Sequence, residues 1–303
     1  MFRISPDGNF TNLYSFPRFN GGGLGPNAAL VQGVDGNFYG TCLGGGANND
    51  GTVFRITPAG TFTNIWQFTG GTDGKWPQSG LVQGTDGNFY GTTPSGGSNA
   101  GGTVYKITPD GTLTPLWQFG SLTNGADGSS PGGGGLVLGS DGNFYGTTAT
   151  GGTNHVFGTI YKITSTGELT PLYQFGSLPN FADGFQAGAP LVQGIDGSFY
   201  GSTRFGGTNG NGGFGTLFKI CVPLNPPANQ ISGLSVADSN IVVAVPSVAG
   251  ETYQLQYRAD LTLDDWSNIP DACVSNSPGA LLTVTNFGGA LAPQGFYRFD
   301  ITP

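Results

Sequence analysis

Aspartate and aromatic residues recur in the long glycine-rich segments of this chain, and they are the side chains best suited to bind a ligand. Aromatic rings among polar hydrogen-bonding groups suit a carbohydrate or a peptide. A structural role is the alternative, because rings also cap the ends of sheets and glycines permit tight loops. The candidate ligand-binding residues are Trp76, Asp73, Asp127, His155, Asp183, Phe185 and Phe205.

Catalysis has few candidate side chains in this sequence. His155 is the single histidine, so a Ser-His-Asp triad would have to use it and a three-histidine metal site is excluded. The only glutamates are Glu168 and Glu251. A glycosidase needs two carboxylates that flank the scissile bond, so the pair would have to come from loop aspartates such as Asp73 and Asp127. On these grounds no residue is assigned a catalytic role.

The composition excludes several classes of partner. The 303 residues include 10 Lys and Arg against 18 Asp and Glu, which gives a net charge of −8. Nucleic acids and anionic membrane surfaces both require clustered cations, and these basic residues are scattered singly. No stretch of about 18 apolar residues predicts a transmembrane helix. Aromatic residues make up 12% of the chain, which is too many for a disordered protein.

Cofactors and disulfides find little support in the sequence. Cys42, Cys221 and Cys273 are too few and too dispersed for a disulfide scaffold or a zinc cluster. A bridge between Cys221 and Cys273 and a pair of half-buried thiols are both open. Calcium takes roughly six to eight oxygen ligands, whereas each recurrent Asp-Gly turn offers one carboxylate. We therefore expect no cofactor, with calcium as the alternative.

An internal repeat predicts the elements that position these residues. The sequence Asp-Gly-Asn-Phe-Tyr-Gly begins at Asp35 and recurs at Asp86 and Asp141, and a copy with Ser in third place begins at Asp196. Within a repeat, β-branched and aromatic residues alternate in short runs bounded by Gly, Pro, Asp and Asn, which predicts four strands. In the second full repeat these strands are residues 81–83, 88–92, 103–108 and 113–119. Four-stranded units of about 40–50 residues are typical of a β-propeller, so the predicted fold class is all-β.

The number of strands leaves two architectures open. The N-terminus supplies two strands, residues 2–5 and 9–16, and the last repeat supplies three. The N-terminal strand could complete the last blade and close a ring of four blades, with one strand left over. The other interpretation is a piece of a longer array, with about four blades plus a partial one. A start inside a repeat without a signal peptide favours the piece.

The repeat pattern ends near residue 221, and a different domain is predicted beyond it. The predicted domains are the propeller repeats at 1–221, a proline-rich linker at 222–228 and a small β-sandwich module at 229–303. Alternating apolar runs separated by turn residues predict the strands of the module, with Trp266 in its core.

The long connections of the repeats are predicted to emerge on one face of the propeller. The first and third connections of each repeat are tight hairpins, while those after the second and fourth strands are long. Ligands commonly bind such loops on a rigid scaffold. Besides the candidate residues above, these loops contain Phe157, Phe181 and Phe214.

The repeat resembles a known bacterial family. The matching motifs in the second full repeat are Gly80-Leu81-Val82, the run 86–93, Gly96-Gly97 and the run 102–107. They resemble the GloVer tandem repeats of choice-of-anchor proteins, and the resemblance covers residues 1 to about 220. It implies an extracellular or cell-surface location and no known reaction. The C-terminal segment is similar to terminal β-sandwich modules of secreted environmental bacterial proteins, through residues 253–258, Trp266 and 296–298.

These features predict a secreted or cell-surface protein with a non-enzymatic binding or scaffolding role, such as glycan recognition on the long-loop face. The alternative is an extracellular polysaccharide hydrolase or lyase on a propeller scaffold, which requires two loop carboxylates within about 5–10 Å. A purely structural role is the third interpretation. The sequence leaves the ligand and the oligomeric state open.

Overall fold

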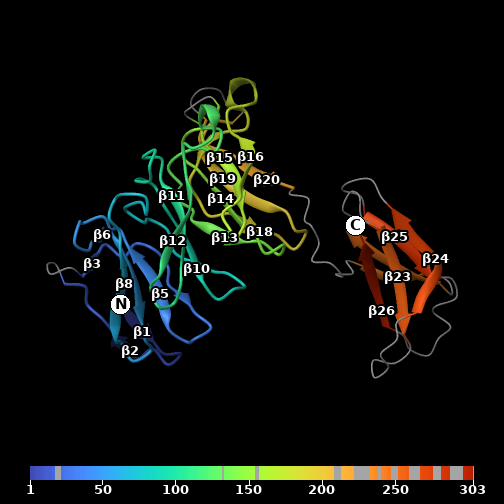
Figure 1. Cartoon of the computed structure of the whole chain (residues 1–303), viewed down its shortest axis with the longest axis horizontal. Helices are drawn as coiled ribbons and strands as arrows, with labels where there is room; N and C mark the ends of the chain where they lie inside the picture. The colour runs from blue at the N-terminus through green and yellow to red at the C-terminus, as the bar shows by residue number, and fades with distance from the viewer. Residues whose placement is uncertain are drawn as a thin grey trace. The chain divides into compact units, whose positions relative to one another are not determined.

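A computed structural model of the chain describes residues 1–17, 22–131, 133–153, 157–207 and 213–221, and six strands beyond them (Figure 1). It divides into two compact units, Met1–Ile220 and Cys221–Pro303. The described residues lie in strands, turns and loops, apart from the single-turn 3-10 helices η1 (Thr123–Gly125) and η2 (Pro179–Phe181). The predicted all-β fold class is therefore confirmed.

The repeats fold into four-stranded antiparallel sheets, which we call blades. The first blade has the strand order β4–β5–β7–β8, the second β9–β10–β11–β12 and the third β13–β14–β15–β16. Their strands are β4 (Val31–Gln32), β5 (Phe38–Cys42), β7 (Thr52–Ile56), β8 (Phe62–Gln67), β9 (Val82–Gln83), β10 (Phe89–Thr93), β11 (Thr103–Ile107), β12 (Leu113–Gln118), β13 (Leu136–Leu138), β14 (Phe144–Thr147), β15 (Thr159–Ile163) and β16 (Leu169–Gln174). A separate ladder joins β3 (Gly23–Leu24) and β6 (Gly44–Gly45). The predicted propeller-like array of four-stranded repeats is confirmed.

The two ends of this unit are incomplete blades. The fourth blade contains β18 (Val192–Gln193), β19 (Phe199–Phe205) and β20 (Leu217–Ile220), and β17 (Phe185–Ala187) pairs with the far half of β19. At the other end of the array, β1 and β2 form a hairpin of their own. Their bounds are Phe2–Ile4 and Phe10–Asn12. Among the described strands β2 pairs with β1 alone, so the N-terminal strand does not complete the fourth blade.

The recurrent Asp-Gly-Asn-Phe-Tyr motif is a turn anchored by its own carboxylate. In the second blade, Asp86 Oδ1 accepts a hydrogen bond from the backbone N–H of Asn88 at 3.1 Å. Its Oδ2 accepts bonds from the Asn88 amide at 2.7 Å and the Tyr90 hydroxyl at 2.8 Å. Burial raises the pKa of Asp86, but these hydrogen bonds outweigh it and hold the pKa below its ordinary value. In the first blade, burial and the hydrogen bond to Asp35 raise the pKa of Tyr39 to about 12.

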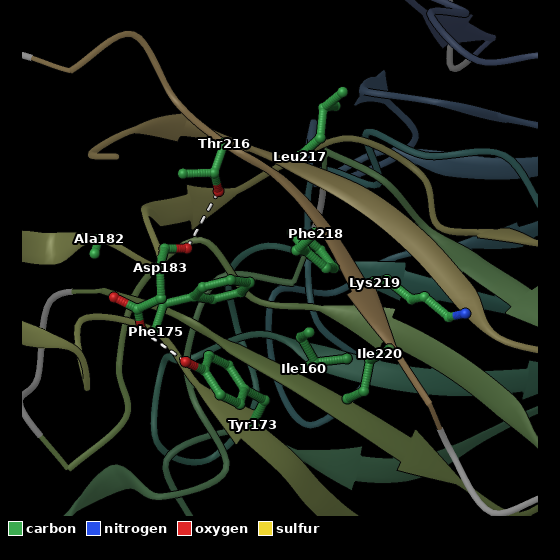
Figure 2. A pocket seen from close by; sticks show the side chains of 10 residues that line it. All are labelled: Ile160, Tyr173, Phe175, Ala182, Asp183, Thr216, Leu217, Phe218, Lys219 and Ile220. Atoms are coloured by element: carbon green, nitrogen blue, oxygen red, sulfur yellow. Dashed lines mark hydrogen bonds between the residues drawn. The ribbon is translucent and has the colours of Figure 1, made fainter. Parts of the chain in front are cut away.

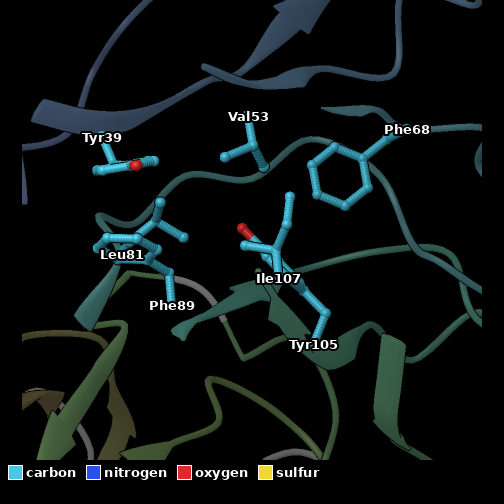
Figure 3. Close-up of a cluster of buried hydrophobic side chains, with 7 residues drawn as sticks. All are labelled: Tyr39, Val53, Phe68, Leu81, Phe89, Tyr105 and Ile107. Atoms are coloured by element: carbon cyan, nitrogen blue, oxygen red, sulfur yellow. The ribbon is translucent and has the colours of Figure 1, made fainter. Parts of the chain in front are cut away.

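The tyrosine of each motif also joins its blade to the next one. Tyr39 stacks on Phe89 with ring centroids 4.0 Å apart, and the same contact recurs between the second and third blades and between the third and fourth. Figure 3 shows the resulting core between the first two blades, in which Phe68 and Tyr105 also lie. The glycine after the motif tyrosine permits this packing, because a Cβ at Gly91 would lie 2.4 Å from the Tyr105 hydroxyl.

The C-terminal unit consists of two three-stranded antiparallel sheets. One has the order β21–β22–β25 and the other β24–β23–β26. The strands are β21 (Gly233–Ala237), β22 (Asn240–Pro246), β23 (Thr252–Arg258), β24 (Ser267–Ser275), β25 (Leu281–Asn286) and β26 (Phe296–Thr302). Trp266, expected in the core of this module, lies outside the described residues, as does the Cys273 side chain. The bridge between Cys221 and Cys273 therefore stays a prediction.

Candidate functional site

The loop aspartates fasten each long loop to the outer strand of the preceding blade. Asp127 is fully buried, and its Oδ2 accepts hydrogen bonds from the Trp117 indole N–H at 3.1 Å and the Ser121 backbone N–H at 3.0 Å. Asp73 repeats this arrangement, with Trp66 Nε1 at 3.3 Å and Thr69 donating from both its backbone and its hydroxyl. Both carboxylates are thus engaged in holding the loop.

Asp183 departs from this pattern. Tyr173 replaces the tryptophan, and Asp183 Oδ2 accepts a hydrogen bond from the Tyr173 hydroxyl at 2.9 Å (Figure 2). The same oxygen accepts a bond from the Ser177 backbone N–H at 3.0 Å. Its buried Oδ1 has no hydrogen-bond partner among the described residues. Burial is the main reason that the pKa of Tyr173 lies above its ordinary value. Of the three loop aspartates, Asp183 is the one with an unused oxygen.

Three residues after each loop aspartate, the backbone adopts a left-handed conformation. The φ angles are +60° at Trp76, +57° at Ser130 and +56° at Gln186. Each of these residues donates its N–H across the loop, as Gln186 does to the Phe157 carbonyl at 2.9 Å. L-residues are strained in this region, so the surrounding fold must impose it. The side chain differs in every repeat while the backbone stays the same.

Ser130 also stands in the sequence Gly-Ser-Ser-Pro-Gly at 128–132, which matches the Gly-x-Ser-x-Gly pattern of a nucleophile elbow. A nucleophile elbow is a sharp turn from a strand into a helix. Here the residues up to 131 form an irregular loop, and Trp76 and Gln186 occupy the same left-handed place. The match follows from the repeat rather than from a hydrolase site.

Four phenylalanines from separate segments meet at the long loops of the third and fourth blades. Phe157, Phe181 and Phe185 contact one another with ring centroids 5.0–5.6 Å apart. Phe185 also stacks on Phe205 at 5.5 Å, and the Arg204 guanidinium lies 5.1 Å from the Phe205 ring. Phe205 keeps 38% of its surface exposed. The structure therefore brings the predicted residues Phe185 and Phe205 together.

An open groove of about 390 Å³ lies on the same blade, and we call it the β19 groove. It is lined by Gln186, Gly188, Ala189, Ser202, Thr203 and Arg204. Thr203 is engaged, because its hydroxyl bonds the Thr216 hydroxyl at 2.9 Å. Within the described residues, no hydrogen bond or ion pair engages the side chains of Gln186, Ser202 and Arg204. The groove thus presents an amide, a hydroxyl and a guanidinium, and the guanidinium lies over the ring of the partly exposed Phe205.

The remaining candidate residues lie elsewhere. Trp76 is 42% exposed in the loop before the second blade, with the Lys75 ammonium 4.4 Å from its ring. His155 lies outside the described residues. Among the residues that the structure describes, no three His, Cys, Asp or Glu side chains converge as metal ligands. Within the same residues, none of the helices has the length and apolar character that crossing a membrane requires.

Comparison with known proteins places the repeats in a family. The family model described as the Gloeobacter/Verrucomicrobia repeat matches residues 1–218. The chain belongs to this repeat family. The resemblance to GloVer repeats seen in the sequence is thereby confirmed for the part of the chain that forms the blades. No curated protein sequence matches the chain.

Solved structures share a weaker likeness with this Gloeobacter/Verrucomicrobia repeat protein. One is an α-L-arabinofuranosidase, CtGH43 from Clostridium thermocellum ATCC 27405, with 17% identity, a TM-score of 0.35 and coverage of 73% of this chain and 81% of that one. Another is GH43B of the xyloglucan PUL of Bacteroides ovatus, with 17% identity, a TM-score of 0.35 and coverage of 91% and 73%. At these scores, the architecture described above rests on the chain's own sheets.

Gln186 and Arg204 escape a search for recurrent residues because they do not recur, whereas Ser202 takes the place of the recurrent Thr41, Thr92 and Thr147. The signal that marks Arg204 is a departure from the repeat. The equivalent residue is Leu43, Pro94 or Ala149 in the other copies, and a charged side chain replaces an apolar or cyclic one only in the fourth. Comparing the copies position by position would have singled it out.

Proposed function

We propose that this repeat protein is a non-enzymatic binding module that recognises a carbohydrate in the β19 groove. The observation that carries the proposal is the group of polar side chains Gln186, Ser202 and Arg204, which make no hydrogen bond or ion pair among the described residues, together with the partly exposed ring of Phe205 at the end of β19. Sugar rings offer an apolar face to an aromatic side chain and hydroxyls to an amide or a guanidinium. The groove supplies the polar partners, and Phe205 of the same blade supplies an aromatic ring.

The charge of the groove favours an acidic sugar. Arg204 is the one ionisable side chain that lines it, and a guanidinium binds a carboxylate through two parallel hydrogen bonds. A uronate or another acidic polysaccharide is therefore the expected class of ligand. An extracellular or cell-surface location follows from this class of ligand and from the choice-of-anchor resemblance.

A polysaccharide hydrolase or lyase is the second candidate, and Asp183 favours it. The buried Oδ1 of Asp183 lacks a hydrogen-bond partner among the described residues, and Asp183 lines a hollow beside β20. Hydrolysis requires a second carboxylate across the scissile bond, and Asp73 and Asp127 are engaged with their tryptophans. The binding role is therefore the function that the geometry supports better.

Affinity electrophoresis in gels that contain neutral or acidic polysaccharides tests the proposal. We expect retardation by an acidic polysaccharide, and a loss of affinity of roughly tenfold or more on Arg204→Ala, since hydrogen bonds to charged groups contribute about 1.5–3 kcal/mol. Ser130→Ala is the matched control, because Ser130 occupies the place of Gln186 in another loop. Retardation that Arg204→Ala and Gln186→Ala leave unchanged would contradict the site. Release of reducing ends, abolished by Asp183→Asn, would favour the hydrolase instead.

A further inference from the structure

The fourth blade has an unfilled place beside its last strand. In the other blades the third strand pairs with a fourth, as β11 does with β12, whereas among the described strands β20 pairs only with β19. A hollow of about 220 Å³ lies next to β20. Figure 2 shows Tyr173 and Phe175 on one side of it, and Phe218 and Ile220 of β20 on the other.

In the complete blades, the first residue of the fourth strand fills the equivalent space. Leu169 begins β16, lies opposite Ile163 in the strand pairing, and belongs to the same apolar cluster as Ile163 and Trp117. The fourth blade has Ile220 at the place of Ile163, and Tyr173 of the third blade stands at the place of Trp117. Among the described strands, none supplies the equivalent of Leu169 to the fourth blade. The hollow is thus the socket of an absent strand.

The N-terminal segment has the sequence of such a strand. Residues 10–16 read Phe-Thr-Asn-Leu-Tyr-Ser-Phe, and residues 62–68 read Phe-Thr-Asn-Ile-Trp-Gln-Phe. Phe10 therefore corresponds to Phe62, the residue that stacks on Tyr14 at 4.1 Å in the first blade. Phe62 is half-buried there, whereas Phe10 is 65% exposed. The chain thus exposes both an unfilled socket and an unburied copy of the strand that fits it.

We propose that residues 10–16 of a second copy of this chain pair with β20 and place Phe10 against Tyr173. Within its own chain this segment remains on the first blade, where Leu13, Tyr14 and Phe16 pack on the cluster of Cys42, Phe54 and Ile56. A second copy is therefore the occupant that leaves this packing intact. Residues 10–16 and the hollow beside β20 are different surfaces of the chain, so the association of the two copies is head-to-tail.

The pairing is an exchange between two strands of like sequence. In its own hairpin, β2 pairs with β1, whose sequence is Phe2-Arg3-Ile4. The socket strand carries Phe218-Lys219-Ile220 in the same order. If β20 replaces β1 in the same register, Ile220 faces Phe10 and Lys219 faces Thr11. Backbone hydrogen bonds are exchanged one for one, and burial of Phe10 is the gain.

Cysteine cross-linking tests the register and the source of the strand. Two single variants, Thr11→Cys and Lys219→Cys, are mixed and oxidised, because residues opposite each other in an antiparallel pair lie within disulfide reach. The interactions of Lys219 are an exposed ion pair with Asp196 and a contact over the exposed Tyr200 ring, so its replacement should leave the fold intact. A dimer of the two variants is expected. The control mixes Thr11→Cys with Lys162→Cys, because Lys162 already faces Thr170 in a complete blade.

The outcomes separate the alternatives. Equal cross-linking with Lys162→Cys would reveal random collision and overturn the proposal. A cross-link that forms only within the double variant, as a monomer, would show that the chain's own N-terminal strand fills the socket and would also overturn it. In sedimentation velocity of the full chain, Phe10→Asp should weaken self-association by roughly tenfold or more. Val34→Asp, at an 89% exposed apolar residue, should leave it unchanged, and a wild-type monomer at all concentrations would refute the assembly.

Discussion

The same substitution at two tyrosines of the second blade should change stability in opposite directions. The Tyr90 hydroxyl donates to Asp86 at 2.8 Å, whereas the fully buried Tyr105 hydroxyl has no partner among the described residues. Tyr90→Phe loses a hydrogen bond to an exposed carboxylate, a cost of about 1 kcal/mol in unfolding free energy. Tyr105→Phe removes a desolvated hydroxyl, and each unsatisfied buried group costs about 1–3 kcal/mol. Phenylalanine already stands at the equivalent places, Phe54 and Phe218.

Urea unfolding followed by tryptophan fluorescence measures both changes. Trp66 and Trp117 report on the blades, and a Trp266→Phe background removes the signal of the C-terminal unit. With a urea dependence of about 1–3 kcal/mol per molar, a change of 1 kcal/mol moves the midpoint by about 0.3–1 M. The midpoint should rise for Tyr105→Phe and fall for Tyr90→Phe, with the slope unchanged. Destabilisation by Tyr105→Phe would show that its hydroxyl is satisfied and would refute the reasoning.

Three further predictions concern the carboxylates and the buried thiol. Asp127→Ala should lower the unfolding free energy by about 2 kcal/mol or more in the same assay, because it leaves the Trp117 indole and two partly buried backbone N–H groups without their acceptor. Hydrogen bonds hold the pKa of Asp86 below its ordinary value, so its contribution is complete above about pH 4 and is lost as the pH falls through the lowered pKa. In a pH series of melting curves, Asp86→Asn should therefore reduce the fall in melting temperature that the wild type shows below about pH 4. Burial raises the pKa of Cys42 to about 11, so mass spectrometry should find Cys42 unalkylated in the native protein at neutral pH and alkylated after unfolding.

The strands were predictable from the sequence because the same pattern of strand and turn residues recurs in four copies. The run 103–108 matches β11 to within a residue, since alternating β-branched and aromatic residues bounded by turns have few other solutions. The recurrent Asp86 turn was equally accessible, because Asp-Gly followed by Asn is local chemistry. The hydrogen bond between Asp127 and Trp117 could not be predicted, since it depends on how a long loop folds back on a strand.

The candidate groove was hidden for a related reason. Arg204 and Gln186 are unique to one copy, and a repeat argument weights what recurs. They come together because β17, which contains Gln186, pairs with the far half of β19, which contains Arg204. A strand of three residues carries almost no sequence signal, since an alternating pattern cannot be recognised over so short a run.

A glycan array probed with the wild-type protein and with Arg204→Ala tests the central claim most directly. The account predicts that the wild type binds one class of acidic glycan reproducibly, that Arg204→Ala loses this signal, and that Ser130→Ala retains it. Binding that survives Arg204→Ala, or no binding to any glycan class, would contradict a carbohydrate site in the β19 groove.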